Sequence, residues 1–568
     1  MSSSQDSFIA NTSPDPYDQI IVLSQKVINA GFNSMWKLAQ GDDESPLTHF
    51  HKSIHGESID ATVGPPSVQL HVESHEPMLY FLLALKTGTI ILYKSQESDD
   101  TISLAVNNWV LAFNVVINQK KITKDSDEYK QFKERAGLPE SNFSLAQLFI
   151  DSSSSTKFNV DLSNTGDTKL DDLSGDSRAS LLTFIDHWIK GMSENGKNIL
   201  GWSAQREHSK AADELNPYAP SFPPTSIDYF CYPWRGTNGQ GSNQDNQDDN
   251  ALSYLLMSDF KNPPAEGAIA YTGPWVDHAS GRDASFCMSR TLFWGWMLPL
   301  VRQVVVAMTP MPDKPYVEYV GTPSDTPWSF GARYHVGDSG ASDSDYQWVP
   351  NGNNGWSTST ADKSSSSGKV VKPGNGNDWE TAEEQATKIQ ATAAFDAGKE
   401  SLTVKGSSKF AFQLNHHRDG MSPTDFWVDV FSSWELELNM TSIEEGGIVF
   451  RVNDSTDHVS VTYDYGGGMK LSRTAKDIAD GIAERLKDSM NGALNDVSGI
   501  LAEAMANANR LCLPAAGTFF MKDPLFNQSG DLLVKLAYDG ADPPPPPSKG
   551  KYRFRPPTLN RSVRRVNA

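Results

Sequence analysis

The chain has 568 residues, 38% of them hydrophobic, and a formal net charge of −21. That length predicts two or three domains, each large enough to bury a core. The acidic excess argues against a nucleic-acid partner, because binding to phosphates depends on Lys and Arg side chains.

The N-terminal segment, residues 1–16, has no basic stretch followed by an apolar one. It therefore lacks the pattern of a secretory signal. We expect a cytoplasmic protein whose first 16 residues are disordered.

The first predicted elements are a strand at residues 18–23 and a helix at residues 25–40. Ser24 is suited to cap this helix, because its hydroxyl can accept a hydrogen bond from the first turn. The apolar face of the helix includes Phe32 and Trp36, which are spaced by four residues.

Alternation of apolar and polar residues predicts a meander of antiparallel strands after this helix. Residues 64–66 are expected to turn the first hairpin and residues 86–89 the second. The last strand is long, has a bulge at residues 107–108, and places Phe113 on its apolar side. The strands are expected at residues 58–63, 68–72, 78–85, 90–93 and 102–117.

The middle of the chain contains predicted helices and one segment that imitates a membrane span. Residues 123–140 and 181–192 are expected to be helical, and residues 143–150 form another apolar element. The run LFWGWMLPLVRQVVVAM at residues 292–308 contains Arg302 and is shorter than the ~20 apolar residues that a bilayer requires. We therefore predict a buried helix with a polar notch at this position.

Residues 316–385 are rich in Gly, Ser, Asp and Asn and are expected to be an irregular linker or insertion. After them the period of two returns and predicts a second meander. Its longest strand alternates around an expected bulge and includes Trp434. The strands of this meander are expected at residues 388–395, 402–404, 409–414, 426–438, 447–452 and 458–465.

One long amphipathic helix is predicted at residues 474–510, which would span roughly 55 Å at ~1.5 Å per residue. Its apolar residues recur in steps of three and four and therefore lie on one side of the helix. A stripe this long and narrow needs a partner surface of similar length, and the flanking strands predict a curved antiparallel sheet. The stripe consists of Ile478, Ile482, Leu486, Met490, Leu494, Val497, Leu501 and Met505.

The order of these elements resembles the tubular lipid-binding (TULIP) superfamily. The opening IIVLSQKVINAGFNSMWKLA looks like the first strand and helix of bactericidal/permeability-increasing proteins. The broader match is to the TULIP accessory proteins encoded beside clostridial neurotoxins and to their fungal relatives. It rests on FSLAQLFID, ALSYLLM, SFCMSRTLFW, and LCLPAAGTFFMKDPLF followed by GDLLVKLAY. This chain has Ala515-Ala516 where that family has two glycines, a departure that concerns the tight turn there.

The elements and the resemblance together predict an α+β fold in which long, strongly curved antiparallel sheets are wrapped around long amphipathic helices. Two TULIP-like parts are expected, with a Pro-rich, basic and disordered tail after them. The expected divisions are residues 1–16, 17–315, 316–385, 386–542 and 543–568.

The resemblance implies an elongated channel between sheet and helix, which holds lipid acyl chains in relatives. Ordinary core packing explains the same apolar residues equally well, because sequence does not separate a channel wall from a core. The aromatic run around Trp294 is open to two interpretations, a channel mouth or a core at a domain junction. The candidate channel-lining residues are Phe32, Trp36, Phe113, Trp434, Ile482, Leu486, Met490 and Leu494.

We therefore predict a carrier or presenter of a lipid or other long hydrophobic ligand that performs no chemistry. One alternative is an enzyme with an apolar chamber that cyclises or isomerises a hydrophobic metabolite, aided by a desolvated acid. Another is an accessory subunit of a multiprotein or toxin-associated complex, with a protein partner or a second copy of the chain. The basic tail allows peripheral membrane contact at most.

Motifs for chemistry are missing from the sequence. It has no GxSxG, no P-loop and no GxGxxG that opens a helix, so we predict no catalytic residue and no cofactor. The cysteines Cys231, Cys287 and Cys512 are widely spaced and odd in number, which indicates neither a disulfide framework nor a CxxC metal site. Histidines cluster without a helical HExxH spacing, so we also predict no metal site. The clustered histidines are His49, His51, His55, His71 and His75.

Overall fold

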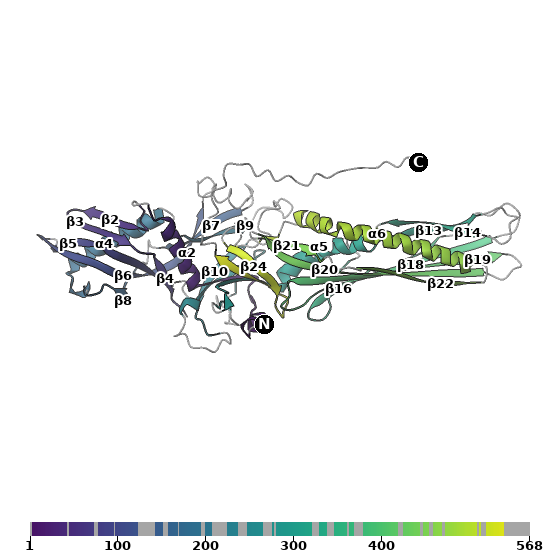
Figure 1. The fold of residues 1–568 in the computed structure, drawn as a ribbon, viewed down its shortest axis with the longest axis horizontal. Helices are drawn as coiled ribbons and strands as arrows, with labels where there is room; N and C mark the ends of the chain where they lie inside the picture. The colour runs from purple at the N-terminus through teal and green to yellow at the C-terminus, as the bar shows by residue number, and fades with distance from the viewer. Residues whose placement is uncertain are drawn as a thin grey trace, which may run out of the picture.

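The computed structural model has a mixed α+β fold built on three large antiparallel sheets that are not closed. The sheets follow one another along the long axis of an elongated molecule (Figure 1). The structure describes all residues except 1–2, 42–44, 73–77, 96, 123–142, 152–156, 169, 195–198, 207–223, 237–246, 265–274, 278–279, 321–328, 338–345, 361–362, 368–378, 419–423, 444–446, 454–457, 469–471, 508–510, 513–518 and 539–568. The helix predicted at residues 123–140, the tail at residues 543–568 and Ala515-Ala516 lie outside the described residues.

A six-stranded sheet in the middle of the molecule combines strands from both ends of the chain. β1 is buried along its whole length and pairs with β11 on one side and β12 on the other. The final strands, β25 and β24, extend the sheet beyond β12. In sheet order the strands are β10 (Ser226–Tyr232), β11 (Ala251–Met257), β1 (Gln19–Ser24), β12 (Ala284–Met288), β25 (Leu532–Tyr538) and β24 (Phe519–Phe526).

The first residues form helix α1 (Ser3–Asn11), whereas the sequence predicts disorder for residues 1–16. Phe8 of α1 is buried in a core on one face of the central sheet, together with Ile20 and Val22 of β1. The guanidinium carbon of Arg282 lies 4.1 Å from the centre of the Phe8 ring. The segment is polar and has no apolar stripe, so its order comes from this long-range contact, which the local pattern does not reveal.

An eight-stranded sheet forms the N-terminal arm. The helix predicted at residues 25–40 is present as α2 (Gln25–Leu38), and Ser24 Oγ caps it by accepting a hydrogen bond from Val27 N at 3.1 Å. α2 contacts β4, and α4 (Gly175–Glu194) contacts β5. The strands are β2 (His49–Ile54), β3 (Glu57–Val63), β4 (Ser67–Leu70), β5 (Met78–Ser95), β6 (Ser98–Ile122), β7 (Phe143–Asp151), β8 (Lys157–Asn164) and β9 (Ile199–Arg206).

Both hairpins predicted in this arm are wrong. β3 and β4 each pair with β5 and not with each other. Residues 86–89 continue β5 instead of turning the chain, because Thr87 and Thr89 pair with β6. Gly88 serves a close approach between strands: a Cβ there would lie 2.2 Å from the Asp60 carbonyl oxygen of β3. Gly88 was therefore interpreted as a turn residue, although it lies inside a strand.

The bulge predicted at residues 107–108 is absent from β6. Asn108 has a positive φ of 51°, in the left-handed region. Pairing nevertheless continues in register on both sides of it, with Leu85 opposite Trp109 and Thr87 opposite Asn107. The strand therefore contains no inserted residue, only a local change of backbone direction.

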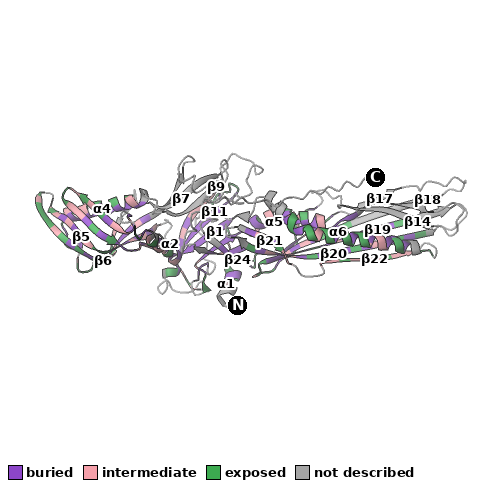
Figure 2. Ribbon diagram, turned by 45° about the horizontal axis from the view of Figure 1, so that its top comes forward, coloured by how far each residue is buried: buried purple, intermediate pink, exposed green. Residues whose placement is uncertain are grey.

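A nine-stranded sheet with two helices forms the C-terminal arm (Figure 1). The helix predicted at residues 474–510 is present as α6 (Ser472–Asn507), which runs along the arm and contacts β20, β22 and the β13–β14 hairpin. Figure 2 shows exposed residues recurring along α6 and buried residues along the strands beside it. The nine strands of the sheet are β15 (Val349–Pro350), β16 (Gly355–Ser359), β17 (Lys363–Ser367), β18 (Trp379–Phe395), β19 (Ser401–Arg418), β20 (Thr424–Ile443), β21 (Gly447–Val452), β22 (Val459–Gly467) and β23 (Leu511–Cys512), and β13 (Met311–Val320) and β14 (Ser329–Gly337) form a separate two-stranded sheet.

Three details of this arm differ from the prediction. The strands predicted at residues 402–404 and 409–414 are one continuous strand, β19. β20 has no bulge, because it pairs with β19 in a single register from Ser401 to His416. Strands β13 to β18 occupy parts of residues 316–385, where we predict an irregular segment: β13 and β14 pair with each other, and β15 to β18 belong to the nine-stranded sheet. The domain divisions themselves remain predictions.

The segment at residues 292–308 lies in helix α5 (Arg290–Met308), as predicted. By length and composition alone α5 could cross a membrane, and half of its apolar window is buried inside the protein. Arg302 is half-buried and forms the expected polar notch. At its N-terminus the Ser289 side chain accepts a hydrogen bond from Leu292 N, and Asp531 Oδ1 accepts one from Arg290 N at 2.7 Å.

Candidate hydrophobic ligand-binding site

The apolar stripe of α6 faces the inner side of the nine-stranded sheet. Ile482, Leu486 and Met490 are fully buried, and Leu494 is half-buried at the edge of the same core. Their spacing of four residues keeps them on one face of the helix. The structure thus places all four candidates of this helix in one row between α6 and the strands.

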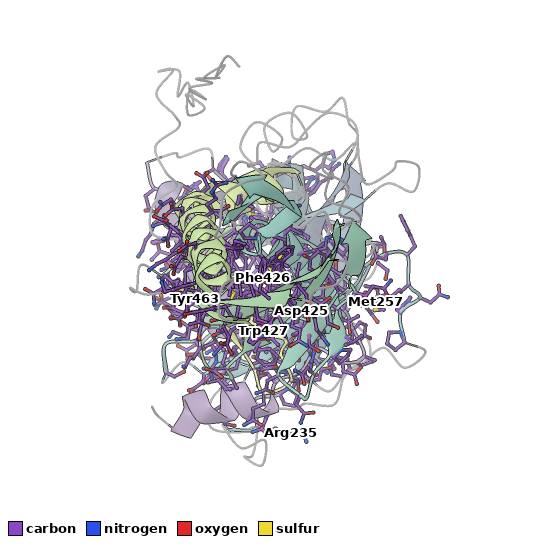
Figure 3. All side chains as sticks on the ribbon, turned by 90° about the vertical axis from the view of Figure 1, so that its right-hand side faces the viewer. Arg235, Met257, Asp425, Phe426, Trp427 and Tyr463 are labelled. Atoms are coloured by element: carbon purple, nitrogen blue, oxygen red, sulfur yellow. The ribbon has the colours of Figure 1, made fainter. Side chains whose placement is uncertain are left out.

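The inner face of the sheet is set by strict alternation along β20. From residue 426 to residue 440 every even-numbered residue is buried, and the odd-numbered residues are exposed or half-buried. Figure 3 labels two neighbours on this strand, Phe426, which is buried, and Trp427, which is 39% exposed. Because side chains alternate across a strand, the apolar set of β20 turns toward α6 as one surface.

Two serine hydroxyls interrupt this apolar inner face where β19 and β20 pair. The hydroxyl oxygens of Ser408 on β19 and Ser432 on β20 lie 2.5 Å apart and are buried. Next to them the Trp434 ring covers Gly406, where a Cβ would lie 2.4 Å from the indole. Trp434 Nε1 is buried, and among the described residues it has no hydrogen-bond acceptor. A buried donor of this kind is costly unless a ligand or water satisfies it.

An apolar row on β22, which we call the β22 strip, continues the inner face beside Trp434. Every member of the strip is half-buried, while the residues between them are mostly exposed. The pairing with β20 places Val459 opposite Trp434 and Val461 opposite Ser432. Sequence reasoning gave these residues no site role, because alternation marks a strand face but not how far a helix covers it. The β22 strip consists of Val459, Val461, Tyr463 and Tyr465.

A polar contact joins the strip to α6. The Tyr463 hydroxyl donates a hydrogen bond to Asp480, and Lys476 Nζ lies 2.7 Å from the second oxygen of that carboxylate. Hydrogen bonds from Lys476 and Tyr463 lower the pKa of Asp480, and the bond to Asp480 raises the pKa of Tyr463. Asp480 therefore stays ionised as an acceptor and fixes the edge strand against the first turns of the helix.

A hollow of about 430 Å³ opens toward the outer, polar face of the same sheet. Its lining includes Lys405 and Glu435, which form an ion pair at 3.0 Å, and His458, whose Nδ1 lies 2.7 Å from the Glu435 carbonyl oxygen. Trp434 and Ala391 also line the hollow, so it combines these charged groups with apolar surface.

Three predicted channel residues lie in the other arm and make packing contacts there. The Phe32 ring meets the Phe81 ring edge-on at 5.9 Å between centroids. Trp36 Nε1 donates a hydrogen bond to the Val63 carbonyl oxygen at 2.9 Å, and the Phe113 ring lies 5.7 Å from that of Phe158. The structure does not bring these residues beside α6, although all eight candidates belong to one continuous apolar core.

The aromatic run at the start of α5 is a core at the junction of the central sheet and the C-terminal arm. Trp294 is buried, and its ring centroid lies 4.2 Å from that of Trp356 on β16 and 5.4 Å from that of Phe526 on β24. The Arg290 guanidinium lies over the outer ring, 4.5 Å from the centre of Trp356. Of the two interpretations, a channel mouth or a junction core, the structure supports the core.

Cys231 and Cys287 are buried free thiols of the central sheet. Burial raises the pKa of Cys231 to about 12 and raises the pKa of Cys287 well above its ordinary value. Since the thiolate is the reactive form, we expect neither to react with a thiol reagent at mildly alkaline pH in the folded protein. The measurement uses a Cys512→Ser variant and compares labelling before and after denaturation. Rapid labelling of the folded variant would contradict the buried placement.

No protein-family model matches the chain, and no curated protein matches it. Several solved structures are similar to it at low sequence identity. P47 from Clostridium botulinum A2 has a TM-score of 0.40 at 10% identity, covering 93% of this chain and 98% of that one. P47 of Clostridium botulinum E1 has a TM-score of 0.38 at 9% identity, covering 92% and 99%. A lipopolysaccharide binding protein has a TM-score of 0.32 at 9% identity, covering 92% and 99%.

Proposed function

We propose that the protein binds a lipid or another molecule with a long hydrocarbon chain between the nine-stranded sheet and α6. The proposal includes the predicted wrapping of this sheet around α6 as in a TULIP fold. It rests on one observation: the β22 strip is apolar but only half-buried, beside the fully buried row of α6. The protein would carry or present the ligand without chemical change.

The length of the β22 strip suits one acyl chain. From Val459 to Tyr465 it covers six residue steps, or about 20 Å at ~3.4 Å per residue. One acyl chain fills half of the roughly 30 Å hydrocarbon core of a bilayer, or about 15 Å. At ~0.8 kcal/mol per buried methylene, ten methylenes buried on one side would contribute roughly 4 kcal/mol before ordering costs.

Trp434 gives the strip a polar end. Its indole lies opposite Val459, where the strip begins, and its N–H has no acceptor among the described residues. A carbonyl or carboxylate oxygen at the head of a fatty chain would accept that hydrogen bond and be anchored there. The hydroxyl groups of Ser408 and Ser432 lie near this indole on the inner face, because Ser432 is two residues before Trp434 on β20.

The enzyme alternative needs a desolvated acid beside the apolar surface. The fully buried carboxylates of the described residues belong instead to the central-sheet region: Asp18, Asp249, Asp277 and Asp531. Burial raises the pKa of Asp531, but that side chain caps α5 and accepts a hydrogen bond from Asn527. This distribution favours a binding protein over an apolar-chamber enzyme.

An accessory role would need an exposed interaction surface. On the outer face of β20, Trp427 is 39% exposed and Phe431 is 41% exposed. Two aromatic side chains bury roughly 150–250 Å² each, well short of the ~1,000 Å² that a specific interface requires. Lipid binding is therefore the better supported function. A protein partner, a second copy, membrane contact by the tail and the cytoplasmic location remain predictions.

The proposal predicts that a charge in the β22 strip reduces ligand binding. Val461→Asp places a carboxylate in the path of the hydrocarbon chain, and we expect at least tenfold weaker binding, since ~1.4 kcal/mol corresponds to a factor of ten. The measurement is native mass spectrometry of the full chain after incubation with a mixed lipid extract. Thr462→Asp is the matched control, because Thr462 is the exposed neighbour on the opposite face of the strand.

Two outcomes would overturn the proposal. The first is that the wild-type chain retains no apolar molecule from the extract. The second is that Val461→Asp and Thr462→Asp bind lipid as well as the wild type while both remain folded by circular dichroism.

A further inference from the structure

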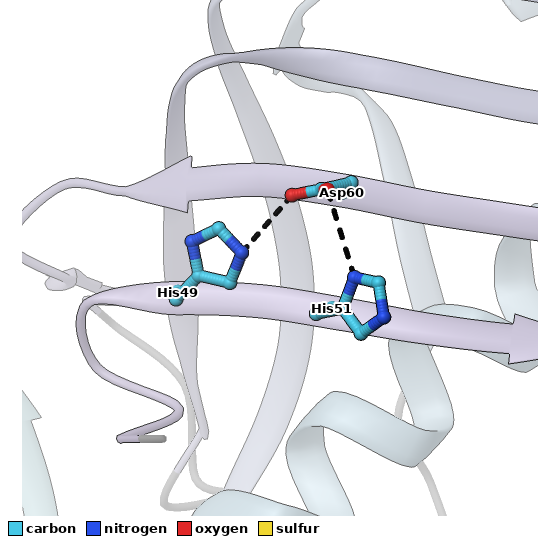
Figure 4. A group of neighbouring side chains, drawn as sticks. All are labelled: His49, His51 and Asp60. Atoms are coloured by element: carbon cyan, nitrogen blue, oxygen red, sulfur yellow. Dashed lines mark ion pairs between the residues drawn. The ribbon is translucent and has the colours of Figure 1, made fainter. Parts of the chain in front are cut away.

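We propose that His49, His51 and Asp60 form a binding site for Zn²⁺ on the solvent-facing side of β2 and β3. Figure 4 shows the two imidazoles side by side on one strand and the carboxylate between them on the next. His49 and His51 share a face because they are two residues apart on β2, and Asp60 is the direct partner of His51 on β3. The site lies in the N-terminal arm and is independent of the proposed lipid site.

The donor atoms have the spacing of metal ligands. His49 Nε2 lies 3.0 Å from Asp60 Oδ1, and His51 Nδ1 lies 3.6 Å from Asp60 Oδ2. One donor atom from each residue can be chosen so that all three lie within 4.8 Å of one another. Tetrahedral zinc with ligands at 2.0–2.1 Å separates neighbouring donor atoms by about 3.3 Å, so small side-chain rotations suffice.

The core behind the strands holds the three ligands in this orientation. Phe50 lies between the two histidines, is buried, and packs near the Trp188 ring at 6.3 Å. Ile59 and Ala61 flank Asp60 and are also buried. A slip of one residue in either strand would expose these apolar side chains, so the pairing that brings the donors together is fixed.

The surroundings leave the site accessible. The side chains of His49, His51 and Asp60 are 35%, 63% and 60% exposed, so an ion can reach them and water can fill the remaining coordination position. Thr62 faces His49 across the strands, and Thr89 of β5 is the partner of Asp60 on its other side. These positions carry hydroxyls, so none of them opposes a cation with a positive charge.

Zinc fits this donor set better than the hard cations. Two imidazole nitrogens and one carboxylate oxygen suit Zn²⁺, whereas Mg²⁺ and Ca²⁺ prefer shells of oxygen. Bound zinc would connect the edge strand β2 to β3. Without a metal, the same residues would form only an exposed histidine–aspartate pair, which contributes little to stability.

The site was missed in the sequence because its carboxylate comes from the partner strand. Of the clustered histidines, only His49 and His51 meet this carboxylate within the described residues. His55 lies at the turn that follows, with a positive φ of 48°, and His71 packs edge-on to Tyr80 at 5.4 Å. Predicting the site would require the register of β2 and β3, and the spacing of the histidines does not give that register.

The test titrates Zn²⁺ into the full, tag-free chain after chelator treatment, in competition with a chromophoric zinc indicator. We expect one strong site per chain and a higher melting temperature with zinc. His51→Gln and Asp60→Asn should each weaken binding at least tenfold and remove the zinc-dependent rise in melting temperature. His187→Gln, which changes an exposed histidine on α4, should bind as the wild type does.

The design separates the site from adventitious zinc binding. If the wild type binds no zinc in competition with the indicator, the proposal is wrong. It is also wrong if His51→Gln and Asp60→Asn keep the wild-type affinity, because the zinc then binds elsewhere. Both substitutions are at exposed positions, and circular dichroism verifies that the variants fold.

Discussion

Ile482→Asp is expected to lower the free energy of unfolding by roughly 4 kcal/mol or more. Ile482 is fully buried in the row of α6 that faces the nine-stranded sheet. The substitution removes an apolar side chain from the core and places a carboxyl group where water does not reach it. Losses of this size are exceptional and arise from buried charge or large cavities. The measurement is urea denaturation followed by circular dichroism.

Asn491→Asp is the control for this change. It introduces the same side chain on the same helix, but at an exposed position, so we expect a difference within about 0.5 kcal/mol. Equal, small effects at positions 482 and 491 would show that α6 does not pack on the sheet through this stripe. The proposed lipid site would then lose the wall on which it depends.

The long, strongly periodic elements could be predicted from the sequence. The stripe from Ile478 to Leu501 predicted α6 and its buried side, since steps of three and four fit a helix. The alternation around Trp434 predicted the buried face of β20. The apolar run at residues 292–308 predicted α5 as a core helix with a polar notch. In each case the periodicity of apolar residues within one segment is enough to predict the element.

Features that depend on distant pairing could not be predicted. Gly88 looked like a turn residue because only the structure shows β3 passing close to it. The proposed lipid site depends on how far α6 covers β22, and the proposed metal site depends on the pairing of Asp60 with His51. The order of α1 depends on Phe8 meeting a sheet that contains the last strands of the chain.

The central sheet makes both arms depend on one another. β1 lies between β11 and β12, and β25 adds the end of the chain beside β12. One face of this sheet belongs to the continuous core that includes the helices of both arms, and the other face carries the smaller core under α1. A weakness in the central sheet is therefore expected to affect the whole molecule and not one arm alone.

Arg282 is the charged residue on which the smaller core depends. Its side chain is fully buried, with the guanidinium 4.1 Å from the Phe8 ring centre and a nitrogen 3.9 Å from an Asp277 carboxylate oxygen. The backbones of Asp277 and Arg282 also bond to each other, at 2.7 and 3.0 Å. The cation thus neutralises a buried carboxylate and stacks on α1 from the same position.

Arg282→Ala is expected to lower the free energy of unfolding by about 3–5 kcal/mol, because it removes the buried cation that pairs with Asp277 and leaves a cavity against the Phe8 ring. The control is Lys26→Ala, which breaks an exposed pair with Asp283 at 3.2 Å and should cost at most about 1 kcal/mol. Adding Asp277→Asn to Arg282→Ala should restore part of the stability, since the buried negative charge is then removed together with its cation. Urea denaturation of the four chains measures these differences. If Arg282→Ala costs no more than Lys26→Ala, the buried pair does not hold α1 and the central sheet together.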